Sequence, residues 1–448
     1  MKKFVKTIKN IWAIEDLRTR ILITLGFAAI YRLGSFIVLP GVNPEGLQQL
    51  ANQPSEGLLS LLNMFSGGAF SNASIFALGI MPYISASIVI QLLTVVVPYF
   101  QKMQREGESG HRKINQYTRY LTIFVLLFQG PFYLMNLYHQ AGNAIVVDST
   151  TFYISSTIIL AAGSMFVLWL GERITDRGIG NGVSLIIMLG IIARLPQAFG
   201  QEVVSRLTAL SGGGLVMFLI EIVLLFGVVL AAILLVQGTR RVPVQYAQRM
   251  VRGQQVGGAR QYIPLKLFAA NVMPIIFAQA IMFIPATLVG FFSKSGQAST
   301  FAMVMSDYRS WQYNVVFALL IIAFTYFYTA ITMNPVQMAE DIKRNNGFIP
   351  GVRPGKDTAD YLDNAMTHLM VPGSIFLAIL ACMPAFTGLL NVTPEFAHFF
   401  GGTSLLILVG VVLDTLQQIE SHLLMRHYDG LMDSGRIHGR NIGTVAAY

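Results

Sequence analysis

Four charged side chains fall inside long apolar stretches of the sequence: Arg32, Arg194, Glu221 and Asp414. Acidic groups in such positions can relay protons or couple the movement of a solute to an ion. The two arginines are long enough to reach toward a membrane surface from within a helix. Nothing in the spacing pairs Glu221 with Asp414, so proton coupling stays a hypothesis that no second feature of the sequence supports.

Isoleucines recur at helical spacing in two of the apolar stretches. Ile80, Ile84 and Ile88 follow one another at every fourth residue, and Ile187 and Ile191 repeat that spacing. Such a stripe is most often an ordinary packing face. The alternative is a ring of branched apolar side chains that closes a pore by excluding water. Spacing alone favours packing and leaves the pore as the sharper hypothesis.

Motifs for enzymatic chemistry are missing from the sequence. It holds no metal-binding HExxH motif, no phosphate-binding GxxxxGK[S/T] loop and no GxSxG nucleophile motif. Cys382 is the only cysteine, so neither a disulfide nor a cysteine-based metal site can form within the chain. We therefore expect no catalytic residues, no metal and no cofactor.

The composition predicts that these residues are positioned by membrane-spanning helices. Of 448 residues, 54% are hydrophobic and 12% are charged, whereas a soluble domain carries about 25% charged residues. Stretches of about 20 apolar residues can cross a bilayer as helices. Ten such stretches occur, at 21–40, 73–97, 118–139, 153–171, 183–199, 215–236, 266–291, 311–332, 368–389 and 402–423.

Lysine and arginine mark one side of the predicted membrane. They cluster in segments 1–20, 102–119, 173–177, 240–266, 343–356 and 426–440. The opposite side holds only Arg206, Lys294 and Arg309. Because positive residues accumulate on the cytoplasmic side, both termini are expected there. Residues 1–20 then form an amphipathic cytoplasmic N-terminus, and 424–448 form a cytoplasmic tail.

Three connections differ from simple turns. The cytoplasmic loops at about 237–265 and 333–367 are long, basic and rich in proline, which favours shaped docking surfaces over charge anchoring alone. The outer segment 41–72 contains an apolar run at 58–65 that is too short to span. We interpret that run as a re-entrant half-helix, with a helix lying at the membrane surface as the alternative.

Ten spans divide into two sets of five, 21–199 and 215–423, joined by an external loop at 200–214. Because five is odd, a second half of similar fold would be inverted in the membrane relative to the first. Inverted halves are common in proteins with a path at their interface. No residue-level repeat is visible between the halves, so this remains an architectural expectation.

Six motifs resemble the SecY/Sec61-alpha family, the channel subunits of protein-secretion translocons. They are YRLGS at 31–35, NMFSGG at 63–68, ALGIMPYISASIVIQLL at 77–93, RGIGNG at 177–182, FIPGVRPG at 348–355 and GGTSLLI at 401–407. The resemblance runs nearly end to end. It implies two five-helix halves around an hourglass pore, with a plug beneath it.

The resemblance also implies roles for individual residues. The pore ring would consist of Ile80, Ile84, Ile187, Ile191, Ile276 and Ile407. The plug, at about 57–70, would include Leu58, Leu59, Leu61, Leu62, Asn63, Met64, Phe65, Ser66, Gly67 and Gly68. The lateral gate, through which hydrophobic segments leave for lipid, would lie between the second and third spans and the seventh and eighth. Gln91 matches a polar position of that gate.

The seventh span departs from the family pattern. Its opening commonly carries an asparagine of the gate, followed three residues later by glycine, and here Phe268 and Asn271 stand in those places. Asn271 is our candidate for the substitute polar contact. In the cytoplasmic loops, Arg240, Arg241 and Arg353 match the basic positions that bind the SecA motor and the ribosome in the family.

The function implied is a protein-conducting channel of the bacterial inner membrane. It would pass unfolded secretory polypeptides and release transmembrane segments sideways into lipid. The implied partners are SecE, SecG, SecA, the ribosome, SecDF, YidC, signal sequences and unfolded substrates. The alternatives are a secondary transporter for small solutes, an accessory translocon channel for specialised cargo and, less favoured, an intramembrane enzyme.

Overall fold

A helix lies in each of the ten predicted spans. The computed structural model describes residues 12, 14–43, 63, 66–141, 145, 147–208, 214–246, 249–251, 254–256, 260–267, 273–292, 307, 309–388 and 392–433. The ten helices are α2 (Glu15–Gly34), α5 (Met81–Val96), α7 (Glu108–Ala141), α8 (Ser149–Arg177), α9 (Gly182–Thr208), α10 (Gly214–Gln237), α11 (Met273–Phe292), α13 (Trp311–Thr332), α15 (Lys356–Thr387) and α17 (Gly402–Asp433). Short helices α6 (Pro98–Arg105), α14 (Pro335–Arg344) and α16 (Pro394–Ala397) complete the described helical structure.

Most of these helices are long and apolar enough to cross a membrane. Within the described residues seven qualify, or eight if α5 and α6, which meet at a bend of 100°, count as one span. Helix α2 is less apolar because it begins with Glu15 and Asp16 and carries Arg32 in its last turn. The apolar part of α11 whose surroundings are described, Met273–Met282, is shorter than a bilayer requires.

Helix boundaries differ from the predictions where polarity and proline intervene. The predicted span at 73–97 is helical only from Met81, because residues 66–80 form turns and Pro82 favours the first turn of a helix. Helix α15 begins at Lys356, inside the predicted loop 333–367, and α9 runs to Thr208, through much of the predicted loop 200–214. Polar helix extensions in water carry no apolar signal, so hydropathy missed both.

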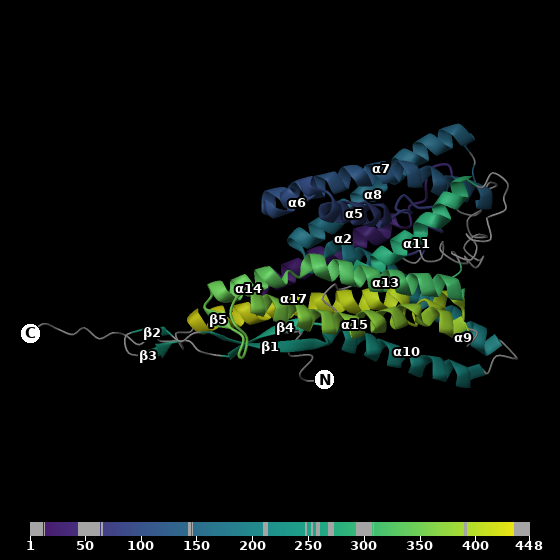
Figure 1. Cartoon of the computed structure of the whole chain (residues 1–448). Coiled ribbons are helices and arrows are strands. Elements are labelled where there is room, and N and C mark those ends of the chain that lie inside the picture. The colour runs from purple at the N-terminus through teal and green to yellow at the C-terminus, as the bar shows by residue number, and fades with distance from the viewer. Residues whose placement is uncertain are drawn as a thin grey trace, which may run out of the picture.

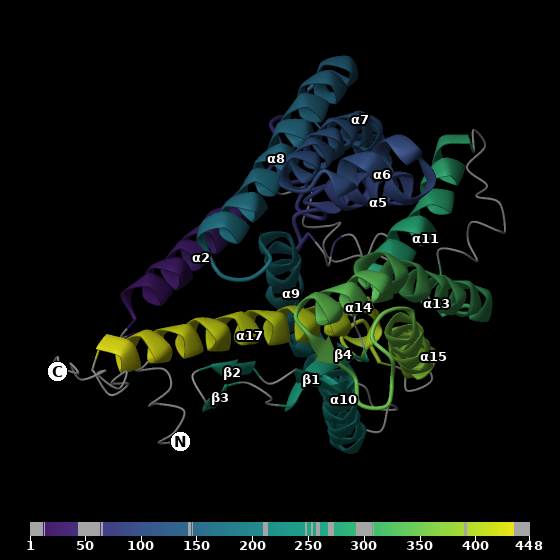
Figure 2. The ribbon, with the colours of Figure 1, turned by 60° about the vertical axis from the view of Figure 1, so that its left-hand side comes forward.

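The helices form two groups of five with the same pattern of contacts. In the first group α2 contacts α8 and α9, α7 contacts α5 and α8, and α8 contacts α9. In the second, α10 contacts α15 and α17, α13 contacts α11 and α15, and α15 contacts α17. Figure 1 and Figure 2 show α2, α5, α7 and α8 on one side and α10, α13, α15 and α17 on the other. Repeated pairing of successive helices is what two halves of like fold require, and the predicted all-α fold class is confirmed.

The two groups meet at two places. Helix α9 contacts α10, α16 and α17, and α5 contacts α11. Buried residues from both groups, among them Ile84 of α5, Ile191 of α9 and Ile407 of α17, belong to one continuous hydrophobic cluster. The groups are therefore joined through α9 and through the α5–α11 contact, which we call the seam.

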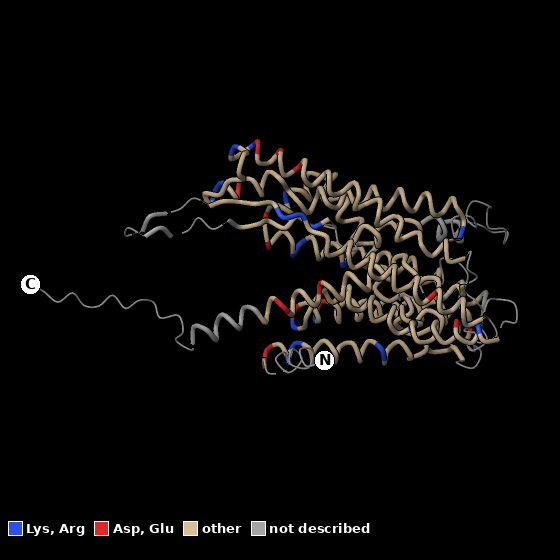
Figure 3. The backbone as a smooth tube through the Cα atoms, turned by 90° about the horizontal axis from the view of Figure 1, so that it is seen from below, with Lys and Arg blue, Asp and Glu red and all other residues tan. Residues whose placement is uncertain are grey.

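The two long predicted loops are joined by a small sheet. Strands β1 (Thr239–Tyr246), β4 (Arg260–Lys266) and β5 (Gly347–Phe348) lie in the order β4-β1-β5, and β2 (Arg249–Val251) pairs with β3 (Gln254–Val256). Antiparallel β1 and β4 align Thr239 with Lys266, and Gln245 of β1 faces Phe348 of β5. Charged residues gather at this sheet end of the helix bundle and are sparse at the opposite end (Figure 3). Shaped loops rather than loose ones were expected, and the sheet supplies the shape.

Candidate functional site

Isoleucines from four helices converge in the hydrophobic cluster between the two groups. Five of the six predicted ring residues are buried: Ile80, Ile84, Ile187, Ile191 and Ile407, none more than 6% exposed. The sixth, Ile276 of α11, is partly buried and packs against the same cluster. All six predicted ring residues therefore belong to, or pack against, one hydrophobic cluster that spans both groups.

Local structure places these side chains on common helix faces. Ile80 caps α5, and its carbonyl accepts a hydrogen bond from the amide of Ile84 at 3.2 Å, so the two side chains stand on one face. Ile187 and Ile191 are one turn apart on α9. Branched side chains are stiff at the first torsion. Such a surface can close against water without binding a passing polar chain.

The predicted plug is described only at its C-terminal end. Of its ten residues, Leu58, Leu59, Leu61, Leu62, Met64 and Phe65 lie outside the described residues. Asn63, Ser66, Gly67 and Gly68 are described, and the three last belong to turns rather than to a helix. We call residues 66–71 the anchor turn, because side chains from α2, α7 and α9 hold it.

A cavity lies at the seam between α5, α7 and α11. Its wall includes Met81 and Ser85 of α5, Gln129, Phe132, Tyr133 and Asn136 of α7, Ala280 of α11, and Phe70, Ala77 and Leu78. Most of these atoms are apolar, with a few amide and hydroxyl groups among them. A site of this kind can hold an apolar segment that carries occasional polar atoms.

The polar residues of this cavity were not predicted. Gln129 and Asn136 are seven residues apart in an apolar helix and so share one face, which is the signal that could have revealed them. Gln91, the predicted gate residue, instead donates from Nε2 to the hydroxyl of Ser87 on its own helix, at 3.1 Å. Phe268 and Asn271 lie outside the described residues.

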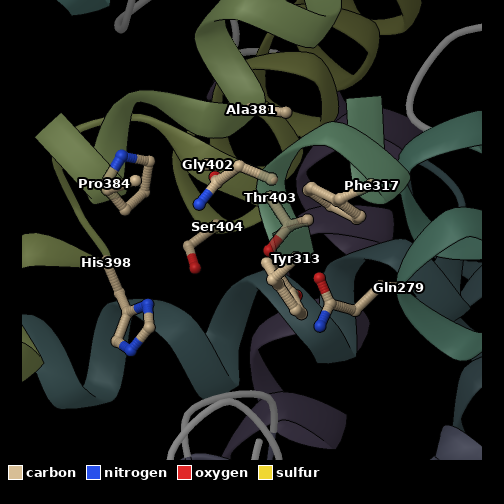
Figure 4. A pocket seen from close by; sticks show the side chains of 11 residues that line it. Gln279, Tyr313, Phe317, Ala381, Pro384, His398, Gly402, Thr403 and Ser404 are labelled. Carbon is tan, nitrogen blue, oxygen red and sulfur yellow. The ribbon is translucent and has the colours of Figure 1, made fainter. Parts of the chain in front are cut away.

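A second, more polar cavity lies inside the second group (Figure 4). Gln279 of α11 is near Tyr313 of α13 there, opposite His398 and Ser404. His398 follows α16, between the spans, and is 4% exposed. Burial lowers the pKa of its imidazole to about 4, and the charge of Arg309 acts in the same direction. The ring is therefore neutral at physiological pH.

A buried ionic cluster joins α9 to α10 and to the segment before α16. Arg206 donates to carboxylates of both Glu202 and Glu221. The amide of Thr393 donates to the second oxygen of Glu202 at 2.9 Å. Glu221, a candidate relay group in the sequence, is thus paired with an arginine, and Asp414 lies half-buried on α17. The proton-relay hypothesis therefore receives no support from Glu221.

The predicted docking arginines occupy different parts of the sheet region. Arg240 and Arg241 are exposed at the first residues of β1, at the base of its hairpin beside α10. Strand β1 starts almost directly after α10 ends, so this pair lies away from the tip of the hairpin. Arg353 is exposed in the turn that follows β5, and its carbonyl accepts a hydrogen bond from Thr358 at 2.8 Å. Among the described residues no cluster of His, Cys, Asp and Glu could hold a metal ion.

Comparisons of sequence point to one family. A family model described as SecY matches residues 74–416. A protein translocase subunit SecY from Vibrio cholerae is 40% identical over 433 residues, covering 95% of this chain and 96% of that protein. The subunit of the same name from Streptomyces scabiei is 42% identical over 431 residues, covering 93% and 97%.

Solved structures with similar folds are channels. One described as a protein conducting channel has a TM-score of 0.66 at 18% identity, covering 90% of this chain and 92% of that one. Sec61 in a canine ribosome-channel complex from the endoplasmic reticulum has a TM-score of 0.63 at 16% identity, covering 90% and 92%. At such identities these matches support the fold, and the sequence relatives carry the family assignment.

Proposed function

The chain belongs to the SecY family and is a multi-pass membrane channel for protein translocation, and we propose that its six clustered isoleucines form the constriction of that channel. Unfolded secretory polypeptides would cross at Ile80, Ile84, Ile187, Ile191, Ile276 and Ile407. The observation that carries this proposal is the burial of residues from α5, α9, α11 and α17 in one apolar cluster.

An apolar constriction suits the task physically. A translocating chain presents side chains of every size and charge, and a collar without hydrogen-bonding groups gives none of them a place to bind. Water and ions are excluded from a narrow apolar passage by dewetting. The same residues could then seal the resting channel and let a moving polypeptide slide past them.

The seam between α5 and α11 is our proposed lateral gate. A signal segment would displace α11 from α5 and rest in the cavity lined by Ser85, Gln129 and Asn136. Lipid solvates a hydrophobic segment well, whereas a charged residue at the bilayer centre costs about 3 kcal/mol on insertion scales. Exit through this seam would therefore sort segments by hydrophobicity. Residues 58–68 would form the plug that closes the channel at rest.

The sheet region is our proposed docking surface. It would lie in the cytoplasm together with both termini, with the protein in the bacterial inner membrane. Arg353 and the pair Arg240 and Arg241 are exposed cations whose planar forks suit carboxylates and phosphates. These chemistries match an acidic surface of SecA and ribosomal RNA. SecE, SecG, SecDF and YidC are the membrane partners proposed on the family resemblance. A channel of this kind acts without a catalytic step of its own.

The proposal is tested by cross-linking in a cysteine-free background. Cys382→Ser removes the native thiol, and Ile84→Cys places a probe in the proposed constriction. A stalled secretory precursor should cross-link there only when a signal sequence and a motor or ribosome are present. Val89→Cys is the matched control, since Val89 lies on the same helix and is 44% exposed. Equal cross-linking at both positions, or none at Ile84, would remove the constriction from this site.

A further inference from the structure

Two tyrosines donate hydrogen bonds to backbone carbonyls of the anchor turn. Residues 66–71 form turns, and irregular backbone inside a membrane protein must find its partners within the protein. The hydroxyl of Tyr31 on α2 donates to the carbonyl of Ser66 at 3.4 Å. The hydroxyl of Tyr133 on α7 donates to the carbonyl of Phe70 at 2.8 Å. Both ends of the turn are thus bound to neighbouring helices.

Two arginines bind the middle and the end of the same turn. Nη1 of Arg32 on α2 donates to the carbonyl of Gly67 at 3.0 Å. Nη2 of Arg194 on α9 donates to the hydroxyl of Ser71 at 2.9 Å, while its Nη1 donates to Gln197 at 3.1 Å. Both side chains are long enough to reach toward a membrane surface, and in the structure they donate hydrogen bonds to the turn. Hydrogen bonds from a charged donor are the stronger kind.

The glycines of the turn show how closely the guanidinium groups approach. A Cβ at Gly67 would lie 2.7 Å from Nη1 of Arg32 and 2.9 Å from the Cα of Gly190 on α9. A Cβ at Gly68 would lie 3.1 Å from Nε of Arg194. Both glycines also have positive φ angles, of 64° and 91°, which other residues rarely adopt. The turn is therefore built so that its backbone lies directly on both arginines.

The anchor turn includes the last three residues of the proposed plug and is also bonded to Asn63, the first described residue of that plug. The carbonyl of Asn63 accepts from the amide of Gly68 at 2.8 Å. Its side-chain oxygen accepts from the amide of Ser71 at 3.0 Å. The turn thus links residue 63 to the segment that leads to Ile80.

All the helices that hold the turn belong to the first group. Tyr31 and Arg32 lie on α2, Tyr133 on α7 and Arg194 on α9. Parting α5 from α11 moves the second group away and leaves these contacts within the first. The contacts of the anchor turn would therefore survive opening of the seam.

We propose that Arg32 and Arg194 are positioning residues that clamp the anchor turn to the first helix group and thereby keep the resting channel sealed. The inference rests on the proposed function, because it needs residues 58–68 to act as a plug. The loss of either arginine would loosen the anchor turn and leave the resting channel leaky to ions, while export of a normal precursor would continue.

The test combines a local and a functional measurement on the full translocase complex in proteoliposomes. Ala69 is fully buried in the turn, so Ala69→Cys in the Cys382→Ser background should resist a membrane-impermeant maleimide. Arg32→Met or Arg194→Met should raise the labelling rate roughly tenfold or more, as expected for losing a hydrogen bond to a charged group. Resting ion leak should rise in parallel. Arg194→Lys keeps a charged donor and should restore most of the protection.

Two further variants make the result specific. Arg173→Met changes an arginine on α8 that lies over Trp169, remote from the turn, and should leave labelling and leak unchanged. Ser71→Ala removes the hydroxyl to which Arg194 donates, together with that hydroxyl's own bond to the carbonyl of Gly68 at 3.1 Å, and it keeps the test open if an arginine variant fails to fold. It should raise labelling in the same direction.

Deletion of residues 58–62 tests the plug assignment separately from the arginine clamp. If the deletion leaks and the arginine variants change neither labelling nor leak, the clamp is wrong and the channel with its plug stands. Raised labelling without leak would overturn the sealing role of the clamp. If the deletion does not leak, the plug assignment falls and the clamp falls with it, while cross-linking at Ile84 still decides the constriction.

Discussion

Nε of Arg206 lies 2.8 Å from Oε1 of Glu202, and the two side chains are 6% and 0% exposed. Arg206 also binds Glu221 of α10, and Glu202 binds the amide of Thr393. This buried cluster thus connects the last helix of the first group to two segments of the second. It would hold the groups together on this side if the proposed gate between α5 and α11 opens.

Arg206→Met should destabilise the protein severely. The change leaves Glu202 and Glu221 buried without their cation, and breaking a buried pair in this way costs about 3–5 kcal/mol. Thermal unfolding in detergent would show the loss as a large fall in the transition temperature. Arg119→Met is the matched control: Arg119 lies 2.7 Å from Glu172, but the side chains are 46% and 31% exposed. That pair should contribute about 1 kcal/mol or less, and equal effects of both variants would refute the argument from burial.

Ile407→Thr should relax the selection of signal sequences. The variant puts a hydroxyl into the proposed constriction, which weakens its exclusion of water and lowers the barrier to opening. Precursors with defective signals should then be exported, as measured by protease protection in vesicles. Val412→Thr, at a position of the same helix that is 37% exposed, should leave selection unchanged. Tight selection in the Ile407 variant would remove this residue from the ring.

Arg353→Glu should abolish motor-driven export without preventing membrane insertion of the protein. Its side chain is exposed in the turn after β5, so reversal of its charge would repel an acidic partner and leave the fold intact. ATP-driven translocation into vesicles and the amount of inserted protein are the two readouts. Lys356→Glu, an exposed charge reversal three residues away, serves as the control. Normal export by the Arg353 variant would exclude a docking role for this arginine.

Acid should weaken the protein through His398. An unfolded histidine takes up its proton near pH 6.5, whereas burial holds the pKa of His398 at about 4. Between these values the unfolded chain binds more protons, so the free energy of unfolding falls as the pH drops. The slope should approach about 1.4 kcal/mol per pH unit.

His398→Leu should flatten this dependence between about pH 6 and about pH 5, measured by thermal unfolding. His368→Leu, which replaces a histidine on an exposed part of α15, should not flatten it. A steep acid dependence that persists without His398 would assign the effect to other groups.

Membrane spans, the family and the overall class could be predicted from the sequence because they depend on local properties. Apolar length determines which segments can span, and the distribution of lysine and arginine predicts orientation without any knowledge of packing. The family assignment was correct because motifs such as residues 77–93 are contiguous. The residues expected in one constriction, for example Ile84 and Ile191, do share one hydrophobic cluster.

Partners and boundaries needed the tertiary structure, because they depend on residues far apart in the chain. Arg194 reaches Ser71 across 123 positions, and β5 joins β1 across about a hundred residues, distances at which no pattern in the sequence records a contact. Helix α5 starts late because residues 73–80 form turns that bond to the residues after α2. Hydropathy sees an apolar segment there, whereas Ile75 donates its amide to the carbonyl of Ile37 at 3.0 Å and the carbonyl of Ala73 accepts from the amide of Leu39 at 2.8 Å.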